Sequence, residues 1–125
     1  MAEIFFVGLG GFFGAISRFL LSRWVSLKLE GVLPYGTLIV NVLGSFFLGF
    51  IMTFFLEKGI THPYLRLAIT TGFIGALTTF STFSYETVVL IEERDWFFAG
   101  MNILSNLLLA LLSVMGGIIV AKAIS

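Results

Sequence analysis

Apolar residues run along this 125-residue chain in four long stretches, separated by short polar segments. The stretches cover residues 4–27, 37–56, 65–91 and 96–121. Each is long enough for a helix that crosses a bilayer, which needs about 20 mostly apolar residues. Residues 28–36, 57–64 and 92–95 carry the glycine, proline or charge that is typical of short loops. The pattern predicts an all-α membrane protein, with residues 1–125 forming one domain of four transmembrane helices.

The composition agrees with this prediction. Hydrophobic residues make up 58% of the chain and charged residues 11%, whereas a soluble domain carries about 25% charged residues. Seven basic and seven acidic residues give a net charge of zero, so nothing points to nucleic acid as a partner. The chain has no cysteine, which excludes a thiol nucleophile and a thiolate metal site. We therefore expect a multi-pass protein whose surroundings are the lipid bilayer.

Basic residues are balanced between the two ends of the predicted helices. Four crossings would put Lys58, Arg66 and Lys122 on one side, and Arg23, Lys28 and Arg94 on the other. The positive-inside rule needs a bias between the two sides, and here there is almost none. Although such a small balanced count can arise by chance, the balance predicts a chain that inserts both ways round and pairs as an antiparallel, dual-topology homodimer.

Small residues recur along the first two helices. Gly10 and Gly14 form a pair four residues apart, and Gly44, Ser45 and Gly49 continue the theme on the second helix. Such residues let helix backbones approach closely in lipid. Four short helices leave little room for a pore inside one subunit. This lack of room and the close helix contacts that small residues allow both favour a dimer.

Residues 72–83 are the most unusual part of the chain. Thr78, Thr79, Ser81 and Thr82 cluster after two glycines in the middle of the third apolar stretch. Loosened backbone at bilayer depth is tolerated only where protein buries it or water reaches it, and broken membrane helices often present carbonyls and amide ends to ions. We expect the third helix to be broken near its middle and to form an ion or solute site. A kinked, close-packed helix crossing is the alternative.

Amide and ionisable side chains lie at depth in the other helices. Thr37 and Asn41 are four residues apart and share a helix face, and Asn102 and Asn106 repeat that spacing. Amides at these positions either join helices or line a polar pathway. Arg18 ends the first apolar run and Glu86 follows the unusual segment. Both are functional candidates by position, with snorkelling to the interface as the alternative.

Two aromatic residues, Phe80 and Phe83, are three positions apart and project near one helix face. An aromatic ring has a positive edge and a negative face, so rings presented edge-on can coordinate an anion without a fixed countercharge. Donors lie nearby in Asn41, Ser81 and Thr82, and no acidic cluster is present to attract cations. The site would suit a small anion.

Three motifs carry a resemblance to a known family. They are GGFFGAISRF at 10–19, GTLIVNVLGSF at 36–46 and GFIGALTTFSTFSYE at 72–86. With the loop layout, they make the chain similar to the Fluc (CrcB) fluoride channels. The resemblance implies a fluoride-selective channel of the bacterial inner membrane that exports fluoride passively. It also implies an antiparallel homodimer with two pores and a structural sodium ion on the dimer axis.

The resemblance also implies roles for individual residues. Phe80 and Phe83 would coordinate fluoride, with Asn41 as the pore asparagine and Arg18 as the vestibule arginine. The remaining predicted pore residues are Thr37, Ser81, Thr82, Asn106 and Glu86. Backbone carbonyls of Gly75 and Thr78 would bind the sodium ion, and a β-branched residue at Gly75 is expected to crowd the loosened backbone.

This sequence departs from the family pattern in two places. Phe19 stands where a tyrosine often follows the arginine, which matters little. Some members carry a track of hydroxyls on the fourth helix where this chain has Asn102, Asn106 and Ala110.

No residues form a catalytic triad or a pair of catalytic carboxylates, so we do not expect an enzyme. A small dual-topology exporter of lipophilic cations is the alternative function. It would need an acidic residue deep in the first helix, whereas Glu3 lies at its start. A non-transporting assembly subunit is a third possibility, although it would need neither the hydroxyl run nor the balanced charges.

Overall fold

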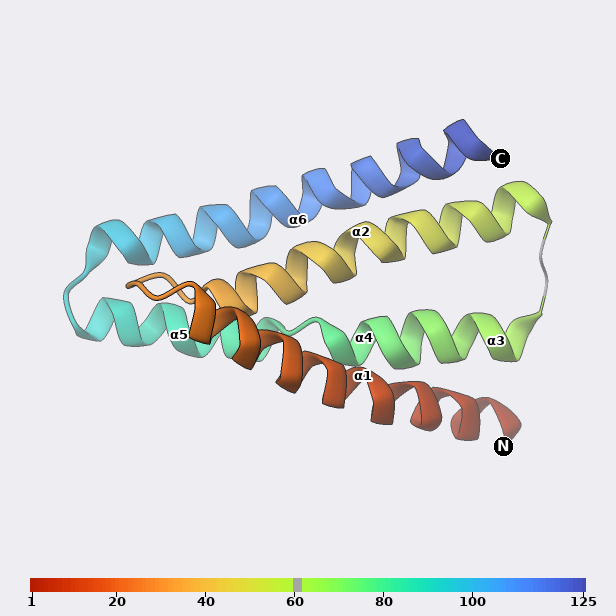
Figure 1. Ribbon diagram of the computed structural model, residues 1–125, viewed down its shortest axis with the longest axis horizontal. Helices are drawn as coiled ribbons and strands as arrows, with labels where there is room; N and C mark the ends of the chain where they lie inside the picture. The colour runs from red at the N-terminus through yellow and green to blue at the C-terminus, as the bar shows by residue number, and fades with distance from the viewer. Residues whose placement is uncertain (60–61) are drawn as a thin grey trace.

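The computed structural model describes residues 1–59 and 62–125, and the predicted spans are helical except for a break in the third. Three spans are single helices: α1 (Ala2–Lys28), α2 (Tyr35–Lys58) and α6 (Trp96–Ile124). The third span, Pro63–Glu92, is made of four short pieces, and all four spans are long and apolar enough to cross a membrane. The predicted all-α, four-span architecture is confirmed (Figure 1).

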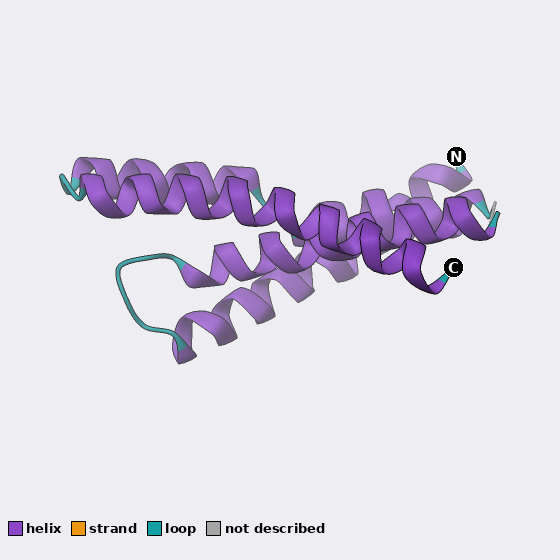
Figure 2. Ribbon diagram, turned by 90° about the horizontal axis from the view of Figure 1, so that it is seen from above, coloured by secondary structure: helices purple, strands orange, loops and turns teal. Residues whose placement is uncertain are grey.

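Successive spans run in opposite directions. Both termini lie at the end of the bundle where α2 finishes and the third span begins, and the 29–34 and 93–95 connections lie at the other end (Figure 1). At that second end, the pair α1–α2 and the pair formed by the last part of the third span with α6 diverge (Figure 2). This arrangement places the two balanced sets of basic residues at opposite ends, as the sequence predicts.

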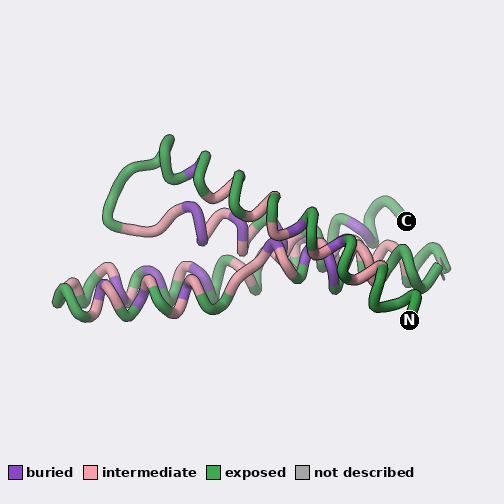
Figure 3. The backbone as a smooth tube through the Cα atoms, turned by 90° about the horizontal axis from the view of Figure 1, so that it is seen from below, coloured by how far each residue is buried: buried purple, intermediate pink, exposed green. Residues whose placement is uncertain are grey.

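Large apolar side chains cover the outside of the bundle. Phe5, Phe12, Trp24 and Leu111 are each about 60% exposed in a single chain. Buried positions form a thin seam where the helices meet, while outward positions are exposed along most of their length (Figure 3). Exposed apolar surface on this scale fits a protein surrounded by lipid tails.

Glycines set the closest helix contacts, and these contacts lie within one chain. A Cβ atom on Gly10 or Gly14 would overlap the carbonyl oxygen of Ala68 or Phe73 in the third span. A Cβ on Gly49 of α2 would overlap the carbonyl oxygen of Val114 in α6. The close approach predicted for these residues is confirmed. Because they are used inside the subunit, however, they do not themselves argue for a dimer.

The third span changes helix type twice before it breaks. It begins with α3 (Pro63–Leu67), capped by the His62 side chain, and continues as the π-helical stretch η1 (Ala68–Ile74) and one short turn, α4 (Gly75–Leu77). Thr78 (φ −84°, ψ 157°) and Thr79 (φ −149°, ψ 122°) are extended, and α5 (Phe80–Glu92) follows. The break predicted near the middle of the third helix is confirmed, whereas the π-helical stretch was not predicted.

Threonine side chains explain where α5 starts. The Thr79 hydroxyl accepts a hydrogen bond from the Thr82 N–H at 3.1 Å, which satisfies one of the unpaired donors of the first helical turn. Thr79 therefore acts as the N-cap of a helix that begins inside the membrane-spanning segment.

Candidate functional site

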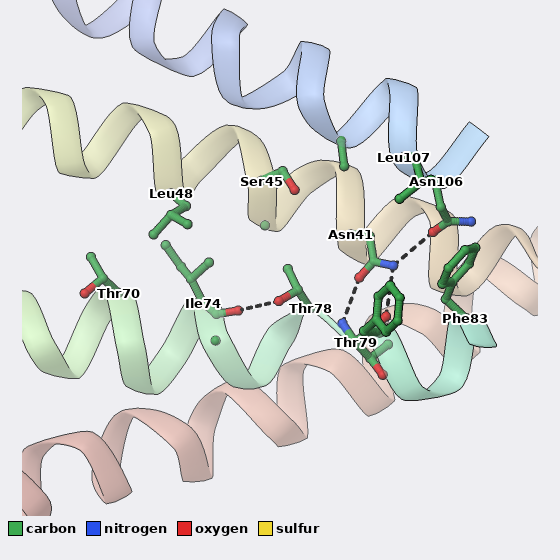
Figure 4. A pocket seen from close by; sticks show the side chains of 14 residues that line it. Asn41, Ser45, Leu48, Thr70, Ile74, Thr78, Thr79, Phe83, Asn106 and Leu107 are labelled. Atoms are coloured by element: carbon green, nitrogen blue, oxygen red, sulfur yellow. Dashed lines mark hydrogen bonds between the residues drawn. The ribbon is translucent and has the colours of Figure 1, made fainter. Parts of the chain in front are cut away.

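A groove of about 280 Å³ lies where the break faces α2 and α6. Its lining includes six predicted residues of the ion site and the less expected hydroxyl side chains shown in Figure 4. The full lining is Asn41, Gly44, Ser45, Leu48, Thr70, Ile74, Gly75, Thr78, Thr79, Phe80, Phe83, Asn106, Leu107 and Ala110. One groove thus unites the aromatic pair, both pathway asparagines and both proposed sodium ligands.

Asn41 holds the broken backbone. Its Oδ1 accepts from the Thr79 N–H at 2.8 Å, and its Nδ2 donates to the Thr79 carbonyl oxygen at 3.1 Å. A carboxamide has the same donor and acceptor as a peptide group, so one asparagine pairs with both main-chain groups of Thr79 and replaces the helical partner that its N–H has lost. A buried backbone polar group without a partner is costly, and Asn41 removes that cost at the break.

The same Asn41 joins two other helices. Its Nδ2 also donates to Asn106 Oδ1 on α6 at 2.9 Å. Both amide hydrogens of Asn41 therefore have acceptors within the chain, and an anion that binds Asn41 must displace one of them. The two roles considered for the asparagines coexist, since Asn41 and Asn106 bond across helices and also line the groove.

The aromatic pair has two different environments. The ring centroids of Phe80 and Phe83 are 5.4 Å apart with the planes tilted by 58°. Phe83 is only 6% exposed, whereas Phe80 is 71% exposed in a single chain. Phe83 is thus held inside the subunit while Phe80 stands at its surface.

Some main-chain carbonyl oxygens at the break accept a hydrogen bond from a side chain, and others do not. Arg18 Nε donates to the Ala76 oxygen at 3.0 Å, and Asn41 occupies the Thr79 oxygen. Among the described residues, no hydrogen bond ends on the carbonyl of Gly75 or Thr78. Free carbonyls are suitable ligands for an alkali cation, so the residues present fit the sodium site that the resemblance implies.

A Cβ atom at Gly75 is not crowded within one chain, whereas the crowding expected of a β-branched side chain there stays a prediction. A Cβ there would meet only the Thr70 carbonyl oxygen at 3.7 Å, an ordinary van der Waals contact. The helical φ of −59° at this residue places no special demand for glycine either.

Arg18 lies beside the break but outside the groove lining. Its bond to Ala76 joins α1 to α4 from the side opposite α2. A snorkelling arginine would direct its guanidinium to the interface, but this one donates to main chain at the middle of the third span. The vestibule role implied for Arg18 stays a prediction.

Three further predicted residues also lie off the groove lining. Ser81 and Thr82 place their hydroxyls 3.3 Å and 3.1 Å from Thr79 Oγ1, at the start of α5. Thr37 is buried at 5% exposure in the first turn of α2. Their roles as pore donors stay predictions.

Glu86 lies three residues beyond Phe83 in α5. It borders a second hollow of about 350 Å³, formed mainly by the 29–35 connection and shared with Glu30. Its Oε1 atom is buried and has no hydrogen-bond partner among the described residues. The structure therefore separates Glu86 from the groove at the break.

Three polar groove residues were missing from the predicted site: Ser45, Thr70 and Thr79. Ser45 follows Asn41 by four residues, a spacing that could have placed it on the same face. Thr79 was recognised only as part of the hydroxyl run, and its capping role depends on where the helix breaks. Thr70 gave no signal, because its position depends on the π-helical stretch.

Comparison with known proteins identifies relatives over nearly the whole chain. The family model described as "CrcB-like protein, Camphor Resistance (CrcB)" matches residues 5–118. A protein of Nitratiruptor sp. named "Fluoride-specific ion channel FluC" is 50% identical over 119 residues, covering 95% of this chain and 91% of the relative. A protein of the same name from Methanocaldococcus jannaschii is 52% identical over 122 residues, covering 98% and 96%. By both comparisons, this chain belongs to the CrcB family.

Proposed function

We propose that this protein is a fluoride-selective ion channel through which fluoride leaves the cytoplasm passively. The observation that carries the proposal is the uncharged groove at the helix break. None of its lining residues, all within the described ranges, has an ionisable side chain, yet an aromatic pair, hydroxyls and amides converge there. The relatives named as fluoride-specific channels support the same activity.

The groove can replace the hydration shell of a small anion. Ring edges of Phe80 and Phe83 offer positive partial charge, and the Ser45 hydroxyl points toward the groove (Figure 4). Selectivity comes from how well such groups repay the cost of dehydration in a narrow path. Chloride is larger, so it would not recover its dehydration cost from groups spaced for fluoride.

A second copy of the chain would complete the site. Phe80 is 71% exposed although it belongs to the proposed anion path, and the groove is open along one side. Balanced basic residues at the two ends support insertion in both orientations, and hence an antiparallel homodimer with two pores. We place this dimer in the bacterial inner membrane.

A structural sodium ion fits between two such copies. The Gly75 and Thr78 carbonyls of both subunits would supply four neutral oxygens to it. The ion would add positive charge where main-chain oxygens from two broken helices converge. In this arrangement the ion holds the subunits together and does not cross the membrane.

Purified protein in liposomes provides the decisive test. We expect rapid fluoride efflux and no measurable chloride efflux when either gradient is applied with a potassium ionophore. Equal fluoride and chloride efflux would contradict selectivity, and no efflux of either anion would contradict a channel. Uptake of a lipophilic cation instead would favour the exporter, although Glu3, its required acidic residue, lies in the first turn of α1.

The antiparallel assembly has its own test. Two lysines added after Lys58, in the connection to the third span, should fix one orientation and remove activity for lack of oppositely inserted partners. Co-expression with a variant carrying two lysines in the 28–36 connection should restore fluoride efflux. Full activity of either variant alone would contradict the antiparallel dimer.

A further inference from the structure

Asn102 of α6 and Thr87 of α5 form a buried support behind the aromatic pair. We propose that these two residues position Phe83 for fluoride conduction, although neither lines the groove. The inference rests on the proposed channel function. It assigns to Asn102 and Thr87 a role as positioning residues, which act on the anion only through Phe83.

The geometry is a continuous chain of hydrogen bonds. Asn41 Nδ2 donates to Asn106 Oδ1 at 2.9 Å, and Asn106 Nδ2 donates to Asn102 Oδ1 at 3.1 Å. Asn102 Nδ2 then donates to Thr87 Oγ1 at 2.9 Å. The Thr87 hydroxyl donates in turn to the Phe83 carbonyl oxygen at 2.8 Å. The chain leaves α2, passes along α6 and ends on the backbone of α5.

The direction of the chain is fixed at its beginning. The Thr79 N–H can only donate, so it determines that Asn41 presents Oδ1 to it and Nδ2 to Asn106. Each later amide must then present its oxygen to the preceding residue and its nitrogen to the next. Since Thr79 starts the chain and Phe83 ends it, one turn of α5 is held at both ends by the same set of bonds.

The support is shielded from both water and the groove. Asn102 is 2% exposed and Thr87 is 7% exposed in the single chain. Burying amides and hydroxyls is costly unless they are paired, whereas replacing both partners by apolar groups of similar shape can be nearly neutral for stability. Folding alone therefore gives no reason for an Asn–Thr pair at this point. A requirement for one fixed pose of the adjacent Phe83 does give a reason.

The contrast with Phe80 supports this reading. Phe80 is exposed, and its carbonyl accepts a bond at 2.9 Å from Ser84 Oγ, a hydroxyl with no side-chain bond to another helix among the described residues. Phe83 is buried, and its carbonyl lies at the end of a chain that spans three helices. Within one subunit, the hydrogen-bond chain thus fixes the position of Phe83 but not that of Phe80.

Three variants test the proposal in reconstituted liposomes. Thr87→Val keeps the shape and removes the hydroxyl, Thr87→Ser restores the hydroxyl without the methyl, and the double variant Thr87→Val, Asn102→Leu removes both partners. Thr53→Val, on α2 and outside the groove lining, is the matched control. Measurements are the fluoride efflux rate, the fluoride concentration at half-maximal rate, and thermal stability of the purified protein.

Thr87→Val should raise the half-maximal fluoride concentration and lower the efflux rate by about tenfold, the factor of one net hydrogen bond. The double variant should melt near the wild-type temperature with the same functional defect, since Asn106 keeps its 3.0 Å bond to the Asn102 main-chain oxygen. Thr87→Ser and Thr53→Val should behave like wild type.

If Thr87→Val has the same half-maximal fluoride concentration and efflux rate as wild type, the positioning role is overturned, whether or not the double variant folds. A rate loss in Thr87→Val that parallels a loss of folded protein, with an unchanged half-maximal concentration, would also overturn it. If the wild-type protein itself fails to conduct fluoride, the proposed function fails instead. The two failures are therefore separate.

Discussion

The two halves of the third span are held by different physical means. The first half, η1 with α4, packs mainly on α1, where Gly10 and Gly14 bring backbone against backbone. The second half, α5, packs on α6 and α2, where amides and hydroxyls bond across the helices. One contact depends on the absence of side chains, and the other depends on particular side-chain atoms.

The difference explains why the helix breaks between the two halves. Each half follows a separate partner, and the extended residues Thr78 and Thr79 join them. Arg18 from α1 bonds the main chain on one side of the break, and Asn41 from α2 bonds it on the other. These bonds from α1 and α2 fix the conformation of the break, in which the Gly75 and Thr78 carbonyls stay free. Close packing and hydrogen bonding should respond differently to mutation.

The glycine contact should be the most sensitive. Gly10→Ala places a Cβ onto the Ala68 carbonyl oxygen, which belongs to backbone and cannot move aside cheaply. We expect a loss of stability of at least about 4 kcal/mol, and hence little folded protein. The matched control is Gly8→Ala, because a Cβ at Gly8 has no neighbour within 4 Å. Size-exclusion profiles and thermal melts in detergent decide the outcome, and equal behaviour of the two variants would contradict the steric account.

In the hydrogen-bonded half, mutation of Asn41 should cause the next largest loss of stability. Asn41→Leu leaves the Thr79 N–H and Asn106 Oδ1 without partners, so we expect a loss on the order of 3 kcal/mol, at about 1–3 kcal/mol per unpaired group. Fluoride efflux should be lost. Asn41→Asp keeps an acceptor for the Thr79 N–H but sets a carboxylate oxygen against the Thr79 carbonyl oxygen and Asn106 Oδ1, so it should lose at least as much thermal stability as Asn41→Leu. Wild-type thermal stability of Asn41→Leu would show that the break does not depend on the Asn41–Thr79 bonds.

The aromatic pair sharpens the comparison, because its members differ in burial. Phe83→Ile should lower stability by about 1 kcal/mol or somewhat more, whereas Phe80→Ile should lower it less, since Phe80 is exposed within its own subunit. Both should reduce fluoride efflux by removing a ring edge. Thermal melts and liposome efflux on the same preparations test both statements. Wild-type efflux in both variants, with intact oligomers, would exclude the rings as anion ligands.

The smallest effect is expected at Thr78. Thr78→Ser keeps the hydroxyl that donates to the Ile74 carbonyl oxygen at 3.2 Å, and it keeps the main-chain oxygen. It loses only the methyl group that lies over Gly44. We expect a change below about 1 kcal/mol and nearly normal fluoride efflux, because the proposed ligand is main chain. A strong loss of efflux would indicate that the side chain itself takes part.

The sequence alone determined the spans, the loops and the presence of a break. Apolar length and loop residues defined four membrane helices, and the cluster of hydroxyls after two glycines placed the break within residues 72–83. Asn41, Asn106, Phe80 and Phe83 were found because polar groups and paired aromatics at bilayer depth require an explanation. These features are local, so a pattern along the chain is enough to reveal them.

Only the tertiary structure decided how these residues are used. The direction of the Asn41–Asn106–Asn102–Thr87 chain and the bond of Arg18 to Ala76 depend on distances between helices that no spacing specifies. Thr70, in the unpredicted π-helical stretch η1, also lines the groove. Helix pairing in lipid depends on which backbones can approach and which polar groups can find partners. Both conditions are met between residues that lie far apart in the sequence.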